Sequence, residues 1–498
     1  MMRVQAIDHA AMLPLYLAAA AAVLALFAGR FAKAAGMIGL GAAAAAAVWV
    51  GLGPDRATFA VGDWHSYVAD DAAMGTAALF AALAVLVAAL SGRQAGEYWF
   101  LLAASAAGGI ALAGSRDLIT LIVAVETLTL PLYVLVTRPG RDGAEAGTTF
   151  LIASVTSSAT ALMGAALLYT ASGTVHLEGL RAGLDGAHAG LTAAGAALLL
   201  AGLAFKLAAA PLHAWAPLVL ERAPLPVATY LASASKLGGA VAITWVVYFG
   251  LSGTASAGVV IAVLSVASIV IGNLGALVQR RTVALLAWSG IAHAGYALAP
   301  LAVIMTATGR DQAGPAASAA LAYAVFFVLL EASAFAAVTA VRPDAGGMFG
   351  SDERRTPRAD LKSGGPLESV LKGGAGNVGP GGRIAELTGL WKSAPLPAAV
   401  LLFSVIGLAG LPPALAGTFA KVAVLEVLAS SAVWLAVVVA AGAVVGLAYY
   451  LPLARVLLVG RADPAPRRFA LAVALAGLAL VAVSVAPQVV LDFTALSR

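Results

Sequence analysis

Fourteen apolar runs, separated by short polar segments, make up most of the sequence. A hydrocarbon core about 30 Å thick is crossed by a helix of roughly 20 apolar residues, and each run is close to that length or longer. The runs therefore predict about fourteen transmembrane helices in an all-α, polytopic membrane protein. They cover residues 10–29, 34–53, 72–92, 97–115, 118–137, 147–171, 190–219, 225–250, 256–278, 283–305, 315–341, 395–424, 429–457 and 467–490.

Composition excludes several other classes of protein. Charged residues are 11% of the chain, whereas soluble domains carry about 25%, so a large soluble enzyme is excluded. The chain has no cysteine, which rules out disulfides, thiolate nucleophiles, Cys-ligated zinc and iron–sulfur clusters on it. No Walker-type or HExxH motif occurs, and we expect no metal or cofactor on this chain. The formal net charge of +5 indicates basic loops at one membrane face, not a nucleic-acid partner.

The distribution of Lys and Arg predicts an orientation in the membrane. Segments that follow odd-numbered runs hold twenty basic residues, and segments on the other side hold six. Because cytoplasmic loops are enriched in Lys and Arg, we expect both termini outside and the long segment 343–390 in the cytoplasm. That segment is rich in Gly and polar residues, which predicts a flexible loop. Its GxGxxG sequence at 374–379 follows no strand and opens no helix, so it predicts no dinucleotide site.

Six ionisable residues lie well inside the apolar runs. A charge at the bilayer centre costs at least about 2.5–3.5 kcal/mol, so such residues normally face a bundle interior or a water-filled path. Desolvation lowers the pKa of a buried lysine and raises that of a buried carboxyl group, so both can exchange protons near neutral pH. The pattern favours a proton relay, and buried ion pairs that only hold helices together are the alternative. The six residues are Glu126, Lys206, Lys236, His293, Glu331 and Lys421.

Two of the runs are interrupted by proline. One contains Pro211 and Pro217 with His213 between them, and the other contains Pro412 and Pro413. Proline removes a backbone donor and opens a helix, and freed carbonyls at membrane depth are tolerated only against protein or water. The two runs are five runs apart and each has a lysine near its break. This indicates an internal repeat with an ion site in each half, and a kink that serves packing is the alternative.

Four segments carry a family resemblance: residues 115–136, 205–240, 280–299 and 404–425. In sequence, order and spacing they resemble the antiporter-like membrane subunits of NADH-quinone oxidoreductase (respiratory complex I). The resemblance implies fourteen helices with two inverted five-helix repeats, each containing a broken helix. It divides the chain into N-terminal helices (1–95), a first repeat (96–250), a second repeat in two parts (251–342 and 391–457) around the loop 343–390, and a C-terminal helix (458–498).

The resemblance also implies a role for each of five residues. Glu126 resembles the glutamate that modulates the first lysine, and Lys206 resembles the broken-helix lysine that is loaded with a proton and unloaded. Lys236 resembles the relay residue at the centre of the membrane, and His293 the histidine of the relay in the second half. Lys421 resembles the terminal lysine from which the proton leaves toward the outside.

The sequence also departs from the family pattern. Thr148 and Thr149 stand where relatives often have a lysine early in the sixth span, which puts the usual input route in question. Glu331 occupies a position that is usually neutral, so we expect it to be an added relay group or a partner for Lys421. His213 is a further candidate relay residue.

These features predict a proton-translocating, non-redox subunit of a translocase in a bacterial cell membrane. The resemblance places NADH, flavin, iron–sulfur clusters and quinone on partner subunits, and implies other membrane subunits of complex I, including adjacent antiporter-like ones, as partners within the lipid bilayer. The alternatives are a subunit of a multi-subunit cation/proton antiporter or of a membrane-bound hydrogenase, and a structural membrane scaffold that has lost pumping.

Overall fold

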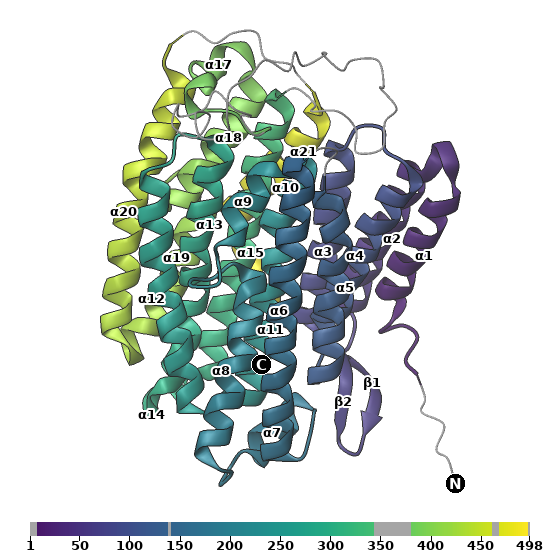
Figure 1. Ribbon diagram of the computed structural model, residues 1–498, viewed down its shortest axis with the longest axis vertical. Helices are drawn as coiled ribbons and strands as arrows, with labels where there is room; N and C mark the ends of the chain where they lie inside the picture. Colours follow the sequence, from purple (N-terminus) through teal and green to yellow (C-terminus); the bar gives the residue numbers. More distant parts are fainter. Residues whose placement is uncertain (1–6, 138–140, 343–379, 461–467, 497–498) are drawn as a thin grey trace, which may run out of the picture.

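The computed structural model describes residues 7–137, 141–342, 380–460 and 468–496. Long helices stand side by side along one axis, and the chain passes up and down between two ends (Figure 1). The helices of the N-terminal half are α1 (Leu13–Phe27), α2 (Ala32–Gly51), α3 (Asp71–Leu90), α4 (Gly96–Gly114), α5 (Leu118–Val136), α6 (Arg141–Ser172), α7 (Leu177–Gly183), α8 (Ala189–Leu207), α9 (Trp215–Arg222), α10 (Leu225–Tyr230) and α11 (Lys236–Trp245).

The C-terminal half continues the bundle with the same kind of apolar helix. Its helices are α12 (Ala255–Leu277), α13 (Thr282–Leu298), α14 (Ala307–Arg310), α15 (Ala313–Val341), α17 (Leu390–Ser393), α18 (Pro395–Ala409), α19 (Leu415–Ser431), α20 (Val433–Leu458), α21 (Ala470–Val485) and α22 (Gln488–Phe493). Short 3-10 turns lie at Gly29–Phe31, Ala299–Met305 and Ile384–Leu387, and π-helical turns flank α11 at Leu231–Ser235 and Val246–Leu251.

The prediction of a helical, multi-pass membrane protein is confirmed. Among the described residues, eleven helices are long and apolar enough to cross a membrane, and α1, α18 and α21 are shorter apolar helices. Each predicted apolar run falls on a helix, a pair of consecutive helices or a helix with a π-helical or 3-10 turn. The number of helices that cross the bilayer and the inverted repeats stay predictions.

The sequence reasoning missed a β-hairpin. Strands β1 (Arg56–Val61) and β2 (Trp64–Ala69) pair antiparallel with Val61 opposite Trp64, so Gly62 and Asp63 form the connecting turn. A two-residue turn that starts with glycine is a strong hairpin signal, but the strands are short and lie between much longer apolar runs. The hairpin lies at the same end of the bundle as α7 (Figure 1). The backbone N–H of Arg116 donates to the carbonyl of Ser66, which ties the hairpin to the start of α5.

Both predicted helix breaks are present. Helix α8 ends where Ala208 adopts a left-handed backbone, with φ of 61°. Helix α18 ends similarly at Gly410, with φ of 81°. Each break contains a cis peptide bond before proline, at Pro211 and Pro413. Backbone groups freed at the first break find side-chain partners: the Trp215 indole donates to the Phe205 carbonyl, and the Ala210 N–H donates to the Ser268 hydroxyl. Such partners satisfy the requirement for irregular backbone at membrane depth.

Three helical segments form the interior of the bundle. In the apolar 18-residue stretch of Leu225–Leu251, 89% of the residues are buried. In the corresponding stretches of Thr282–Met305 and Ala313–Val341, 94% are buried. These three segments carry Lys236, His293 and Glu331. The fold therefore places ionisable side chains at its centre and away from surrounding lipid.

Residues 343–379 of the predicted flexible loop lie outside the described residues. From Pro380 onward the chain packs on the end of the bundle. The N–H of Thr282 donates to the Gly382 carbonyl, the N–H of Ile384 donates to the Arg280 carbonyl, and Leu387 is 1% exposed. Described residues before 391 are therefore already packed on the bundle, ahead of the position where the sequence predicts that the second part of the second repeat begins.

Candidate functional site

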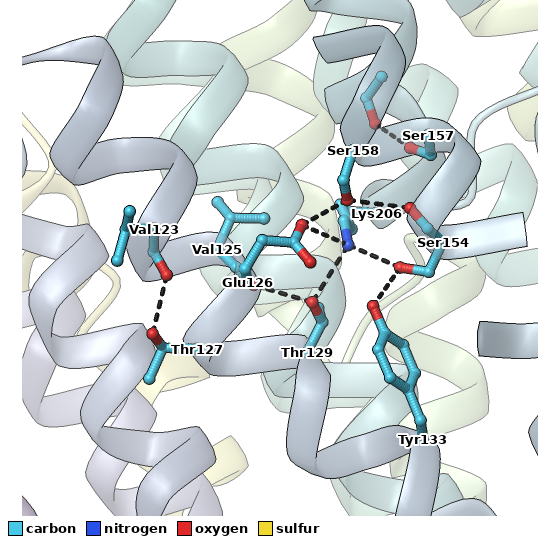
Figure 2. Close-up of polar contacts among 11 residues, drawn as sticks. Val123, Val125, Glu126, Thr127, Thr129, Tyr133, Ser154, Ser157, Ser158 and Lys206 are labelled. Atoms are coloured by element: carbon cyan, nitrogen blue, oxygen red, sulfur yellow. Dashed lines mark hydrogen bonds and ion pairs between the residues drawn. The ribbon is translucent and has the colours of Figure 1, made fainter. Parts of the chain in front are cut away.

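The first ion pair of the site joins helices α5 and α8 (Figure 2). The Lys206 ammonium lies 3.0 Å from Oε1 of Glu126. The lysine side chain is 3% exposed and the glutamate side chain is 30% exposed. The Ser158 hydroxyl, on α6, donates to the same Glu126 oxygen. The Lys206 ammonium is therefore enclosed, whereas the Glu126 carboxylate is partly exposed at the surface of the chain.

Lys206 also has neutral hydrogen-bond partners. Its ammonium donates to the Ser154 hydroxyl at 2.7 Å and to the Thr129 hydroxyl at 3.1 Å. Ser154 is in turn hydrogen-bonded to the Tyr133 hydroxyl, and Figure 2 shows these side chains converging on the amine. With Glu126, the three N–H groups of the ammonium have three acceptors. Lys206 lies in the last turn of α8, where the helix dipole also favours a cation.

The second ion pair joins α11 and α15 and is enclosed completely. The Lys236 ammonium donates to both oxygens of Glu331, at 2.9 Å and 3.1 Å, and both side chains are 1% exposed. The amine also lies 5.2 Å from the centre of the Phe327 ring. A Cβ added at Gly290 would collide with the Lys236 amine, so this glycine leaves the space that the pair occupies. Of the two roles expected for Glu331, the pairing with Lys421 is wrong, because α15 presents this carboxylate to Lys236 on α11. Its role as an added relay group stays a prediction.

His293 lies next to the second ion pair. Its Nδ1 is 2.8 Å from the Tyr323 hydroxyl and its Nε2 is 3.1 Å from the Tyr450 hydroxyl. Its ring stacks on Phe327 with the ring centres 4.8 Å apart, and Phe327 also faces the Lys236 amine. Both ring nitrogens therefore have hydroxyl partners that can donate or accept, which is the arrangement that passing a proton through a histidine requires.

Lys421 lies at the second helix break. Its ammonium donates to the carbonyls of Leu408 at 3.0 Å and Ala409 at 2.7 Å, the last two residues of α18. Among the described residues it forms an ion pair with no carboxylate. Lys421 comes from α19, the half-helix after the break, and reaches back to cap α18, whereas Lys206 lies on the half-helix before its break.

His213 stands apart from the ion pairs. It lies between α8 and α9, with its ring centre 5.4 Å from that of Trp288. Its Nδ1 is buried without a hydrogen-bond partner in the described part of the chain. Thr148 and Thr149 lie early in α6, and Thr148 is exposed. The side chains by which α6 reaches Lys206 and Glu126 are hydroxyls further along the helix, at Ser154 and Ser158.

Sequence reasoning missed the neutral members of the site. Charged residues are conspicuous within apolar runs, whereas residues with hydroxyl groups are common there. The signal was present, because Tyr323 and Tyr450 lie within apolar runs as His293 does. A second polar cluster adjoins the histidine: the Tyr449 hydroxyl donates to the Asn273 amide oxygen, and the Asn273 amide donates to the Tyr296 hydroxyl. In the described residues, no group of three or more His, Cys, Asp or Glu side chains is placed to hold a metal ion.

The chain is similar to known membrane proteins in sequence and in fold. The family model described as NADH:quinone oxidoreductase/Mrp antiporter, TM, matches residues 115–352 and 376–446. NADH-quinone oxidoreductase subunit N of Salinispora tropica is 45% identical over 91% of this chain and 85% of its own length. A chain of respiratory complex I from Thermus thermophilus is 29% identical, with a TM-score of 0.76, over 97% of this chain and 98% of that one. A chain of the Mrp complex from Dietzia sp. DQ12-45-1b shares the fold, with 22% identity and a TM-score of 0.79 over 98% of this chain and 97% of that one.

Proposed function

The chain belongs to the family of NADH:quinone oxidoreductase and Mrp antiporter transmembrane subunits, and we propose that it is the antiporter-like subunit N of a proton-translocating NADH-quinone oxidoreductase. It carries no redox group in this proposal. NADH oxidation and quinone reduction take place on partner subunits, other antiporter-like subunits lie beside it in the cell membrane, and both termini face outside.

One observation supports this function above the rest: the ionisable side chains inside the bundle are arranged across its two halves with partners suited to proton transfer. The Lys206 ammonium pairs with Glu126 and donates hydrogen bonds to two hydroxyls. Lys236 is held by Glu331, and His293 lies between two tyrosine hydroxyls. Ion pairs that served only to hold helices together would not require Lys421 to lie at a helix break on backbone carbonyls.

The proposed mechanism is electrostatic and begins at Glu126. While this carboxylate lies beside Lys206, its negative charge favours the protonated lysine. A rearrangement in a neighbouring subunit draws the partly exposed carboxylate away, and Lys206 then releases its proton. Because Thr129 and Ser154 accept hydrogen bonds from an ammonium or a neutral amine, Lys206 keeps its position in both states. The proton continues by way of Lys236 and Glu331, then His293, and Lys421 releases it toward the outside.

The test replaces Lys206 or Lys421 by alanine in the assembled complex. In membrane vesicles, NADH-driven quinone reduction and proton translocation are measured together. We expect translocation per electron pair to fall severalfold in both variants. Lys392→Ala is the matched control, because Lys392 is exposed and donates to the Gly460 carbonyl at the end of the bundle. Unchanged pumping by the Lys206 and Lys421 variants would reject the relay.

Two further measurements separate the alternatives. A structural scaffold predicts that Lys236→Ala leaves translocation intact in an assembled complex. A cation/proton antiporter subunit predicts that a Na⁺ or K⁺ gradient moves protons in vesicles without NADH. We expect loss of translocation in the first experiment and no cation-driven proton movement in the second.

A further inference from the structure

A cleft at one end of α12 and α20 has a basic rim and apolar walls. Its volume is about 490 Å³. Arg280 and Arg383 line it at the rim, and Leu277, Tyr449, Pro452 and Val456 are among its apolar walls. Helix α12 has 23 residues, which at about 1.5 Å per residue is close to the thickness of a hydrocarbon core. Arg280, three residues beyond the helix, therefore lies at the level of lipid headgroups.

The two arginines have no acidic partner within the described residues, unlike others nearby. Arg281 pairs with Glu221 at 2.8 Å, and Arg342 pairs with Glu386. By contrast, Arg280 and Arg383 form no ion pair in the described part of the chain, and both are exposed.

Backbone contacts hold the two arginine segments side by side. Arg281 and Arg383 form an isolated antiparallel bridge, and the N–H of Ile384 donates to the Arg280 carbonyl at 3.0 Å. Two guanidinium groups are thus brought to one cleft without a counter-charge among the described residues. An anion between them relieves their mutual repulsion, and planar guanidinium groups match the oxygens of a phosphate.

We propose that this cleft binds one anionic phospholipid, with its phosphate between Arg280 and Arg383 and an acyl chain along α20. Basic pockets between transmembrane helices are suited to such headgroups. The apolar wall continues into exposed apolar surface, since Leu274 is 59% exposed and Leu451 is 48% exposed. A free anion would use the rim alone, whereas a phospholipid also uses the apolar walls.

The same features argue against a proton entrance here. Tyr449 lines the cleft and donates to Asn273, so the cleft adjoins the polar cluster beside His293. However, the two guanidinium groups that line the cleft, unpaired within the described chain, repel an incoming proton, whereas a proton entrance is better served by carboxylates. The proposal concerns lipid binding and does not depend on the proposed relay.

Native mass spectrometry of the full chain in detergent tests the proposal, with dioleoyl phosphatidylglycerol or dioleoyl phosphatidylcholine added. We expect Arg280→Gln/Arg383→Gln to weaken binding of the tightest phosphatidylglycerol roughly tenfold and to leave phosphatidylcholine binding unchanged. The matched control is Arg30→Gln/Arg93→Gln, which removes two exposed arginines from segments that do not line the cleft. Its phosphatidylglycerol binding should match that of the parent chain.

Three outcomes would overturn the proposal. The first is equal binding of phosphatidylglycerol by the cleft variant and the control. The second is an equal loss of phosphatidylcholine and phosphatidylglycerol binding in the cleft variant. Alternatively, inorganic phosphate without lipid could displace the bound phosphatidylglycerol at millimolar concentration, which would indicate a simple anion site. Equal thermal unfolding midpoints of the two double variants establish that a difference in lipid binding does not arise from misfolding.

Discussion

The two buried lysine–glutamate pairs have similar N–O distances and very different surroundings. The Glu126–Lys206 pair is 3.0 Å long and its carboxylate is 30% exposed. The Lys236–Glu331 pair is 2.9 Å long and both of its side chains are 1% exposed. Lys206 has two hydroxyl partners in addition to its carboxylate, whereas Lys236 has only Glu331 and the face of Phe327 within the described residues.

Because of this difference, separating the charges costs less free energy in the Glu126–Lys206 pair than in the Lys236–Glu331 pair. Removing one partner of a fully buried pair leaves an uncompensated charge without water, which costs several kcal/mol. At Lys206 the hydroxyls and the partly exposed carboxylate reduce that penalty. The first pair is therefore suited to respond to a neighbouring subunit, and the second to hold a proton at the centre of the bundle.

The largest expected effect is that of Glu331→Ala. It leaves Lys236 enclosed without a counter-charge, so we expect a loss of about 3–5 kcal/mol in the free energy of unfolding. The thermal unfolding midpoint of the full chain in detergent, followed by tryptophan fluorescence, measures it. The double variant Glu331→Ala/Lys236→Ala should recover part of the loss because the unpaired charge is gone. If Glu331→Ala were as stable as the parent chain, this would contradict the enclosure of the Lys236–Glu331 pair.

A smaller effect is expected for Gly290→Ala. The added Cβ would collide with the Lys236 amine and approach Glu331, so the pair must shift within a packed interior. We expect a loss of about 1–3 kcal/mol, the range typical of overpacking, in the same unfolding assay. Gly41→Ala is the control, because a Cβ on that helical residue meets open space. The stability of the control should be unchanged or slightly higher than that of the parent chain. Equal stability of the two variants would contradict the close approach of Gly290 to the Lys236 amine.

The smallest expected effect on stability is that of Glu126→Ala. Lys206 keeps Thr129 and Ser154 as partners and the carboxylate is partly exposed, so we expect a loss of about 0.5–1.5 kcal/mol, the net contribution of a typical hydrogen bond. Proton translocation should nevertheless fall strongly, because the proposed coupling acts through this carboxylate. Glu97→Ala is the control for removing a carboxylate, since Glu97 is exposed at the start of α4. A stability loss equal to that of Glu331→Ala would remove the distinction between the pairs.

The two broken helices could be located from the sequence, but the contacts of their lysines could not be predicted. Pro211 and Pro412 mark the breaks because proline cannot continue the hydrogen bonding of a helix. The order of the chain puts Lys206 before its break and Lys421 after its break, but what each amine contacts depends on how the helices pack. Lys206 meets Glu126 on another helix, and Lys421 turns back to the carbonyls of α18.

The apolar runs alone were sufficient to predict that this is a helical membrane protein and that six ionisable groups lie deep within it. Hydropathy and helix length are local properties, and a lysine inside such a run must be buried or paired. Partner choice is not local. Glu331 lies 95 residues from Lys236, and Tyr450 lies 157 residues from His293. How each helix is rotated and which neighbour it packs against decide those contacts, so only the tertiary structure shows that Glu331 pairs with Lys236 and not with Lys421.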